Sequence, residues 1–297
     1  QALAVVHQSD ISTWIRCPHA FMLQRAGQPQ RQSSATAYGS VMHHALETFE
    51  RLRHTEGVKF ADAIQAAVET FIHYWHPMNI EAICPQVDLW LPRQTYNDLR
   101  ARGAEAIRAY AHLMRYDDHE LLATEYSFVV PIAGTWDEDT GSPHVLAGTI
   151  DRLAVRHYSG LPTVAVDDFK TGKEYKYLRQ NLQFTAYCYA TTRREFWVGA
   201  DGEEGFGPDR GPALYERFQA CARRGTWINM RTVKFQDAGW RGPDDYARFA
   251  LAVEQQQASQ RADIFPLSMS GEHCQFCEFK DICAGVGVPD NSHGAPR

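Results

Sequence analysis

The sequence predicts an α/β fold in which β-strands are flanked by helices. Three helix-like segments open the chain, three short segments rich in valine follow in its middle, and a further helix comes directly after them. Strands that alternate with helices usually form a sheet covered by helical layers. With 297 residues, 44% of them hydrophobic and 22% charged, the chain has the composition of a globular protein large enough to need no disulfide staples.

Each element is expected from its local pattern. The stretch GSVMHHALE has helical spacing, because Gly39, His43 and Glu47 are four residues apart and share one face, with Leu46 beside them. The stretches LLATEYSFVV and VLAGTIDRLAV are typical of strands, and NLQFTAYCYATTRR of a helix. The segment 199–225, rich in glycine and acids, is expected to be an insertion. The predicted helices are 39–54, 59–76, 95–116, 178–195 and 243–261, and the predicted strands are 122–131, 145–156, 163–169 and 226–235.

The stretch VAVDDFKTGK places charged residues at the end of a predicted strand. Alternate side chains of a strand share a face, so Val164, Val166, Asp168 and Lys170 point one way, whereas Asp167 points to the opposite face. A carboxylate and an ammonium group on one face can both reach a bound phosphate or metal ion. The alternative is an exposed strand end that carries an ordinary surface ion pair.

The net charge of −6 argues against a protein that binds polyanions through its overall charge. Electrostatic attraction acts over about 8–10 Å at cellular salt, so a basic groove can still exist on an acidic protein. One basic run alternates with tyrosines between residues 170 and 179; its cations are Lys170, Lys173, Lys176 and Arg179. A solvated face is the other interpretation of this run.

Four of the seven cysteines predict a metal centre. Three of them form a C-x2-C-x5-C run, CQFCEFKDIC, and Cys17, which precedes a proline, is the best candidate for a fourth ligand; Cys84, also before a proline, is its rival. The spacing alone leaves an iron-sulfur centre and a zinc site, completed by His273 or His19, equally open. Cys188 and Cys221 are expected to be small buried hydrophobic residues. The predicted ligands are Cys17, Cys274, Cys277 and Cys283.

Neither a membrane span nor secretion is expected. No run approaches the 18 or more apolar residues that cross a bilayer, and the first residues lack the pattern of a signal peptide. An odd number of cysteines also argues against a disulfide framework. We therefore expect a cytoplasmic protein, or one that acts inside an infected or host cell.

Six motifs in a fixed order carry a family resemblance. They are CPHAF near the N-terminus, GSVMHHALE at 39–47, GTIDR at 148–152, DFKTG at 168–172, QFTAY at 183–187 and the C-terminal cysteine run. This order resembles the PD-(D/E)XK nuclease superfamily, and within it the RecB-like exonucleases with an iron-sulfur cluster, including CRISPR-associated and AddB-type members. The resemblance extends from residue 12 to residue 283, although it is weak between the motifs.

The resemblance implies a restriction-endonuclease-like core with a central mixed sheet, all in one nuclease domain over 1–297. Its parts would be a helical region at 39–116, a catalytic core at 120–198 and an iron-sulfur segment at 262–285 that is joined to Cys17 as a cap. It also implies that Asp151, Asp168, Lys170 and His43 are catalytic. The implied Mg²⁺ or Mn²⁺ ligands are His43, Asp151, Asp168 and the backbone carbonyl of Phe169. Such an oxygen-rich set suits a hard ion. Glu125 is a possible accessory acid, but an exposed strand residue is the preferred interpretation.

The implied activity is metal-dependent exonucleolytic cleavage of single-stranded DNA, from the 5′ end, with a [4Fe-4S] cluster as a second cofactor. Two other functions stay open: a catalytically silent DNA-binding subunit of a helicase-nuclease or CRISPR adaptation complex, and a zinc-stapled RNA-processing nuclease. In the family, Gln183 and Tyr187 contact the substrate strand or support the active-site lysine. The expected DNA-binding residues are Gln183, Tyr187, Lys173, Lys176 and Arg179.

Overall fold

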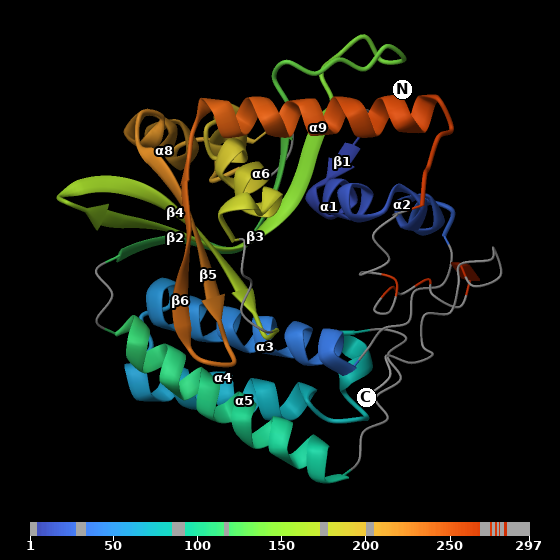
Figure 1. Ribbon diagram of the computed structural model, residues 1–297. Helices are drawn as coiled ribbons and strands as arrows, with labels where there is room; N and C mark the ends of the chain where they lie inside the picture. Colours follow the sequence, from blue (N-terminus) through green and yellow to red (C-terminus); the bar gives the residue numbers. More distant parts are fainter. Residues whose placement is uncertain are drawn as a thin grey trace. The chain divides into compact units, whose positions relative to one another are not determined.

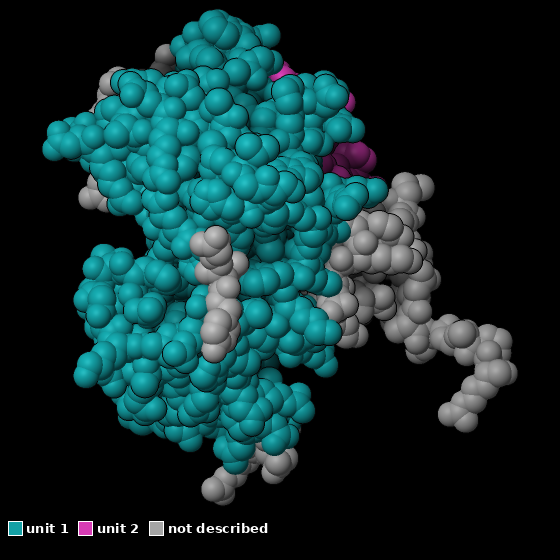
Figure 2. All heavy atoms as spheres, turned by 90° about the vertical axis from the view of Figure 1, so that its left-hand side faces the viewer, with its two compact units in different colours: residues 1–8, 32–251 teal, residues 9–31, 252–297 magenta. Residues whose placement is uncertain are grey.

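The fold is described from a computed structural model of the whole chain. The described residues are 5–27, 34–84, 93–115, 119–172, 178–199 and 205–267, with 274, 277, 279, 282 and 283 near the C-terminus. Two compact units can be distinguished in the chain (Figure 2). The first unit comprises residues 1–8 and 32–251, and the second comprises 9–31 and 252–297.

The first unit contains a six-stranded mixed sheet, which confirms the predicted α/β class. The strands are β1 (Val5–His7), β2 (His119–Pro131), β3 (Val145–Tyr158), β4 (Leu161–Lys170), β5 (Ala222–Asn229) and β6 (Lys234–Arg241). Their order is β1-β3-β4-β5-β6, and β2 pairs with β3. The pairs β1–β3 and β4–β5 are parallel, and the other pairs are antiparallel. The valine-rich middle of the chain thus supplies the long central strands β3 and β4.

Helices cover this sheet with apolar side chains. The helices α3 (Ser34–Glu50), α4 (Phe60–Tyr74) and α5 (Arg93–Met114) lie side by side, and their core includes Phe169 of β4 and Ile228 of β5 (Figure 1). A π-helical turn, η1 (Arg51–Thr55), follows α3. Elsewhere α6 (Leu182–Ala190) contacts β3 to β6, and α7 (Arg194–Val198) contacts β2 and α8 (Arg210–Phe218). The short helix η2 (Ile80–Ala82) follows α4.

Three predictions need correction. The predicted strand 226–235 is a hairpin, because Asn229 Oδ1 accepts hydrogen bonds from the backbone of Arg231 and Thr232 at 2.9 and 3.1 Å and turns the chain. The predicted helix 178–195 consists of η3 (Leu178–Gln180), α6 and α7. Asn181 caps α6 by accepting from the Gln183 N–H at 2.8 Å. The segment 199–225 is not simply an insertion, because it contains α8 and the start of β5.

The second unit contains residues from both ends of the chain. Its helices are α2 (Pro18–Arg25) and parts of α1 (Gln8–Arg16) and α9 (Pro243–Arg261), which has the predicted bounds. A small apolar cluster of Ala20, Leu23 and Phe279 lies within it. No helix among the described residues is both long and apolar enough to cross a membrane.

A buried ion network ties α3 to β3 and β4. Asp167 faces away from the neighbouring Asp168 side chain and accepts from Arg152 at 2.6 Å and from both terminal nitrogens of Arg156 at 2.7 and 2.9 Å. Arg152 Nε also donates to Glu50 Oε1 at 3.0 Å. Burial would raise the pKa of Asp167, but Arg156 and Arg152 outweigh it and hold the pKa below its ordinary value. The carboxylate is therefore ionised and fully paired.

Removal of the Asp167 charge should destabilise the fold strongly. Asp167→Asn keeps the shape of the side chain but leaves Arg152 and Arg156 with too little negative charge, so we expect the free energy of unfolding to fall by about 3–5 kcal/mol. The matched control is Glu120→Gln, which breaks the exposed pair of Glu120 with Arg217 and should cost at most about 1 kcal/mol. Urea unfolding followed by circular dichroism measures both. Equal losses in the two variants would contradict the assigned role of the buried network.

Candidate active site

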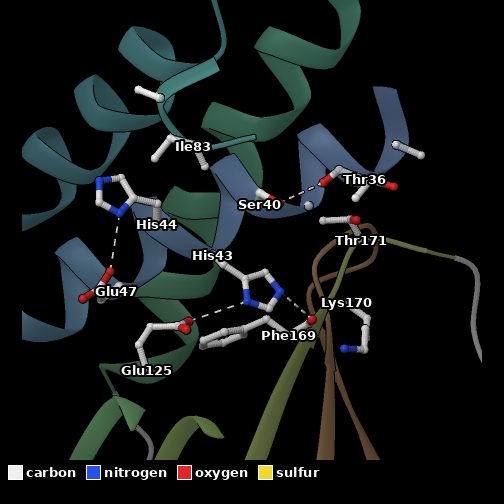
Figure 3. Close-up of a pocket in the computed structure, with 13 residues that line it drawn as sticks. Thr36, Ser40, His43, His44, Glu47, Ile83, Glu125, Phe169, Lys170 and Thr171 are labelled. Atoms are coloured by element: carbon white, nitrogen blue, oxygen red, sulfur yellow. Dashed lines mark hydrogen bonds and ion pairs between the residues drawn. The ribbon is translucent and has the colours of Figure 1, made fainter. Parts of the chain in front are cut away.

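His43 is the histidine of α3 that faces the strands. It lies between β2 and the end of β4, where Figure 3 shows its ring pointing toward Glu125 and Phe169. His44 points away from this place and contacts Glu47 Oε2 at 3.4 Å. Adjacent helix positions differ by about 100°, so only one of the two imidazoles can face the sheet. The side chain of His43 is one quarter exposed.

Asp151 and Phe169 meet where β3 and β4 run side by side. Asp151 Oδ2 accepts a hydrogen bond from the Phe169 N–H at 2.7 Å and lies 3.5 Å from His43 Nδ1. The other ring nitrogen, His43 Nε2, lies 2.9 Å from the Phe169 carbonyl oxygen. The imidazole thus contacts Asp151 through one ring nitrogen and the Phe169 carbonyl through the other.

Glu125 completes this group, although sequence reasoning gave it the weaker role of an exposed strand residue. The β2–β3 register pairs Thr124 with Arg152 and Tyr126 with Ile150, so Glu125 lies opposite Asp151. Glu125 has a left-handed backbone with φ of 44°, and its Oε1 lies 3.6 Å from His43 Nδ1. Donor atoms of His43, Glu125 and Asp151 all lie within 4.8 Å of one another, as one metal ion requires.

Asp168 and Lys170 share the other side of the strand end. Lys170 Nζ lies 2.9 Å from Asp168 Oδ1, which also accepts from Gln183 Nε2 of α6 at 2.7 Å. Asp168 is almost fully buried, whereas the Lys170 side chain is one third exposed. The ammonium group is therefore fixed by its carboxylate partner and still open to a ligand. Asp168 interacts electrostatically with Asp151 and His43 without belonging to the group that contains Glu125.

The electrostatics of the site favour a bound cation. Burial raises the pKa of Asp151, and it raises the pKa of Asp168 to about 6 against the lowering effect of Lys170. Burial opposes the charged form of His43, but Asp151 and Glu125 outweigh it and raise the His43 pKa to about 9. For Lys170, burial is likewise outweighed, by Asp168 and Asp151, so its pKa is raised. Partly desolvated carboxylates therefore attract positive charge to this place.

The donor set fits a divalent ion such as Mg²⁺ or Mn²⁺. It offers carboxylate oxygens of Glu125 and Asp151, the backbone oxygen of Phe169 and one imidazole nitrogen of His43. Hard ions prefer such oxygen-rich sets and leave their other positions to water or phosphate. A cavity of about 760 Å³ opens beside the group and is lined by α3, the Ala82–Ile83 turn and the end of β4 (Figure 3). A phosphodiester could approach the donor atoms from this cavity.

The residues expected to bind DNA are not all gathered here. Tyr187 is buried, and its hydroxyl lies 3.4 Å from Gln183 Nε2, so it supports the Gln183–Asp168 contact and has no free ring face for a base. Arg179 is exposed and lies 3.9 Å from Asp237 of β6. Lys173 and Lys176 lie outside the described residues.

The four candidate thiols belong to the second unit. Cys17, Cys277 and Cys283 pack against the apolar cluster of Ala20, Leu23 and Phe279. Burial raises the pKa of Cys283, and the electrostatic influence of Cys277, Cys17 and Cys274 raises it further. Of the rival ligands, Cys84 is buried in the core of the first unit, and His273 lies outside the described residues. Cys188 is fully buried, with its pKa raised to about 12 by burial, and Cys221 is half-buried.

One family model matches most of the chain. The sequence model of the PD-(D/E)XK nuclease superfamily matches residues 6–284. No curated protein matches the chain. Among solved structures, the chain is similar to the crystal structure of SSO0001, with 11% sequence identity, a TM-score of 0.34 and coverage of 97% of this chain and 89% of that one.

Proposed function

The chain belongs to the PD-(D/E)XK nuclease superfamily, and on that premise we propose that it is a metal-dependent, RecB-like exonuclease that cleaves single-stranded DNA from its ends. One observation carries the catalytic part of this proposal. Donor atoms of His43, Glu125 and Asp151 converge, the Phe169 carbonyl lies against His43 Nε2, and Asp168 holds the Lys170 ammonium group at the same strand end. A chain that only bound DNA would have no need of such a costly, desolvated set of charges.

Each residue of the site has a separate role in the proposed reaction. His43, Glu125, Asp151 and the Phe169 carbonyl would hold the ion, which supplies a Lewis acid and an acidified water when it is bound. The Lys170 ammonium group orients the attacking water and offsets the negative charge that develops on the phosphoryl oxygens. Asp168 fixes the position of Lys170, and Gln183 fixes Asp168. The attack therefore occurs at a phosphodiester that enters from the cavity beside α3.

Single-stranded DNA is the proposed substrate because of the charge beside the site. Lys170 begins a basic run that includes Lys173, Lys176 and Arg179, with tyrosines between them. Single strands bind to tracks that combine cations for the backbone with aromatic rings for the bases. The 5′ polarity and a partner of the helicase or CRISPR type are proposed from the family resemblance.

The activity is tested on end-labelled DNA with Mn²⁺ or Mg²⁺. Wild-type protein should shorten single strands from the end, should need the ion, and should prefer them to duplex DNA and to RNA of the same sequence. A chemical block on the 5′ end of the strand should stop cleavage, whereas a block on the 3′ end should not. Asp168→Ala should remove cleavage. Equal cleavage by wild type and Asp168→Ala would overturn the assignment, no cleavage by wild type would favour a silent binding subunit, and preference for RNA would favour an RNA-processing nuclease.

The metal dependence should change with pH in a defined direction. Because the pKa of the ligand His43 is raised to about 9 and that of the ligand Asp151 is also raised, protons compete with the ion at low pH. For each ligand that must lose a proton, the affinity for the metal ion falls about tenfold for every pH unit below the pKa of that ligand. The rise in Tm caused by Mn²⁺ should therefore be larger at about pH 7.5 than at about pH 5.5, since ligands that bind the native state stabilise it by mass action. Equal rises at the two pH values would contradict this.

We also propose that Cys17, Cys274, Cys277 and Cys283 hold a [4Fe-4S] cluster. The support is the C-x2-C-x5-C spacing of the C-terminal run, the influence of the other three thiols on Cys283, and the packing of Cys17, Cys277 and Cys283 against one apolar cluster. A cluster that joins Cys17 to the C-terminal run closes a very long loop, which costs little extra entropy because this cost grows only logarithmically with length. Such a centre would fasten the two ends of the chain together.

Metal analysis after anaerobic purification distinguishes the two kinds of centre. The wild-type protein should be brown and contain iron and labile sulfide in equal amounts, whereas a zinc protein is colourless. Cys283→Ala should lose both elements and much of the stability of the second unit. The control is Cys221→Ala, at a half-buried cysteine that directly precedes β5 and lies outside the group, which should keep both elements. Zinc without sulfide in the wild type would exclude the cluster.

A further inference from the structure

We propose that Glu50, His54 and His119 form a second metal site, which binds a zinc-type divalent ion. The three residues lie near the C-terminal end of α3, about two helical turns after His43. Glu50 is the last residue of α3, His54 belongs to the π-helical turn η1, and His119 is the first residue of β2. π-helical turns are rare and occur often at functional sites. An ion held here would join the helical layer to the sheet.

The donor atoms of the three side chains already converge. Glu50 and His54 are four residues apart, so they share a face, and Glu50 Oε2 lies 3.3 Å from His54 Nε2. The rings of His54 and His119 are tilted by 58° with centroids 5.3 Å apart. One donor atom from each of the three residues lies within 4.8 Å of the others. Small rotations of the two rings would bring these atoms to coordination distance.

Glu50 is oriented as a metal ligand by its other contacts. Its side chain is fully buried, and Oε1 accepts hydrogen bonds from the Tyr110 hydroxyl and from Arg152 Nε. Oε2 accepts no hydrogen bond among the described residues and faces His54. Arg152 is itself paired with Asp167, so its charge is shared. Partners that fix one oxygen of a carboxylate while the other stays free for the ion are typical of metal sites.

A site with two imidazoles and one carboxylate favours a different kind of metal ion from the one that the His43–Glu125–Asp151 group favours. Nitrogen-rich sets favour zinc and its neighbours in the transition series, whereas the oxygen-rich group around Asp151 favours Mg²⁺ or Mn²⁺. Three protein ligands leave a fourth tetrahedral position for water. That position can be reached from solvent because the His54 side chain is 29% exposed.

The proposed ion is not the second metal of a two-metal nuclease. His43 and Glu50 are seven residues apart on α3, which is about 10 Å along the helix axis. Two catalytic ions lie about 3.5–4 Å apart, so an ion at Glu50 cannot share a phosphate with one at Asp151. An ion at Glu50 therefore takes no part in cleavage at the catalytic group, and its occupancy is independent of whether the chain cleaves DNA.

Zinc uptake by the whole protein tests the proposal. Wild type, His54→Gln, His119→Gln and the control His157→Gln, an exposed residue near the end of β3, are dialysed against one zinc buffer in excess Mg²⁺. Zinc held by the cysteines or by the catalytic group is the same in all four proteins and cancels. Glutamine can keep hydrogen bonds of each histidine, and circular dichroism verifies that each variant is folded.

Wild type and His157→Gln should each hold one more equivalent of zinc than His54→Gln and His119→Gln. Zinc should raise the Tm of wild type by more than it raises the Tm of either variant. Cobalt(II) should add the ligand-field bands of a tetrahedral nitrogen and oxygen site in wild type, and the two variants should lack them. Equal zinc content in all four proteins, or an equal loss in His157→Gln, would overturn the proposal.

Discussion

Lys170→Met should lower the rate of DNA cleavage by about a thousandfold at saturating metal. The variant removes the ammonium group, which lies at the open side of the site, and keeps most of the aliphatic stem. A group that assists proton transfer and stabilises developing charge contributes about 10² to 10⁴ to a rate. The loss is measured from initial rates on end-labelled single strands across a range of Mn²⁺ concentrations.

Lys170→Met should slow the cleavage step without weakening the binding of the metal ion. Lys170 lowers the pKa of Asp151 and Asp168 and repels a cation, so its removal should leave Mn²⁺ affinity unchanged or make it tighter. Calorimetric titration with Mn²⁺ checks this. The control is Lys234→Met, at an exposed lysine of β6, which should cleave like wild type. A rate for Lys170→Met within tenfold of wild type would remove Lys170 from the mechanism.

Asp151→Asn should weaken Mn²⁺ binding by about a hundredfold or more. The substitution removes one charge that lies next to the proposed ion, and a unit charge at about 4 Å in a partly buried site is worth several kcal/mol. The amide oxygen can still accept the hydrogen bond from the Phe169 N–H, so the strands should stay in place. Cleavage at low Mn²⁺ should therefore be lost, with partial recovery at high Mn²⁺.

A second measurement on Asp151→Asn needs no metal. Asp151 is the largest influence that raises the pKa of His43, so in the variant this pKa should fall from about 9 toward or below its ordinary value. An NMR titration of the His43 ring in metal-free protein measures the shift. The control Asp139→Asn, in the exposed connection between β2 and β3, should change neither the titration nor metal binding. An unchanged His43 titration would contradict the described contact.

The sequence was sufficient for features that depend on local pattern. The strands around 122–131, 145–156 and 163–169 and the helix 243–261 follow from periodicity, and the structure places them within a few residues. Strand parity also separates Asp167, which enters the buried ion network, from Asp168, which contacts Lys170. These inferences needed only the geometry of one element at a time.

Features that depend on pairing between distant segments could not be found in this way. Glu125 joins His43 and Asp151 because of the β2–β3 register and its left-handed backbone, and the sequence there carries no glycine to signal it. The second strand of the β5–β6 hairpin was hidden because TWINMRTVKF has high β-propensity throughout, and only Asn229 indicates a turn. The Glu50–His54–His119 group likewise brings His119 together with two residues that precede it by 65 and 69 positions.

The ion network around Arg152 has a consequence for the fidelity of folding. Two residues of the network, Arg152 of β3 and Asp167 of β4, are immediate neighbours of carboxylates of the candidate site, because Asp151 precedes Arg152 and Asp167 precedes Asp168. A slip of either strand by one residue would exchange the two faces and bury an unpaired acid where a guanidinium belongs. The salt bridges therefore favour the correct register of β3 and β4, because a sheet with either strand shifted by one residue would be less stable and would also misplace the residues of the candidate site.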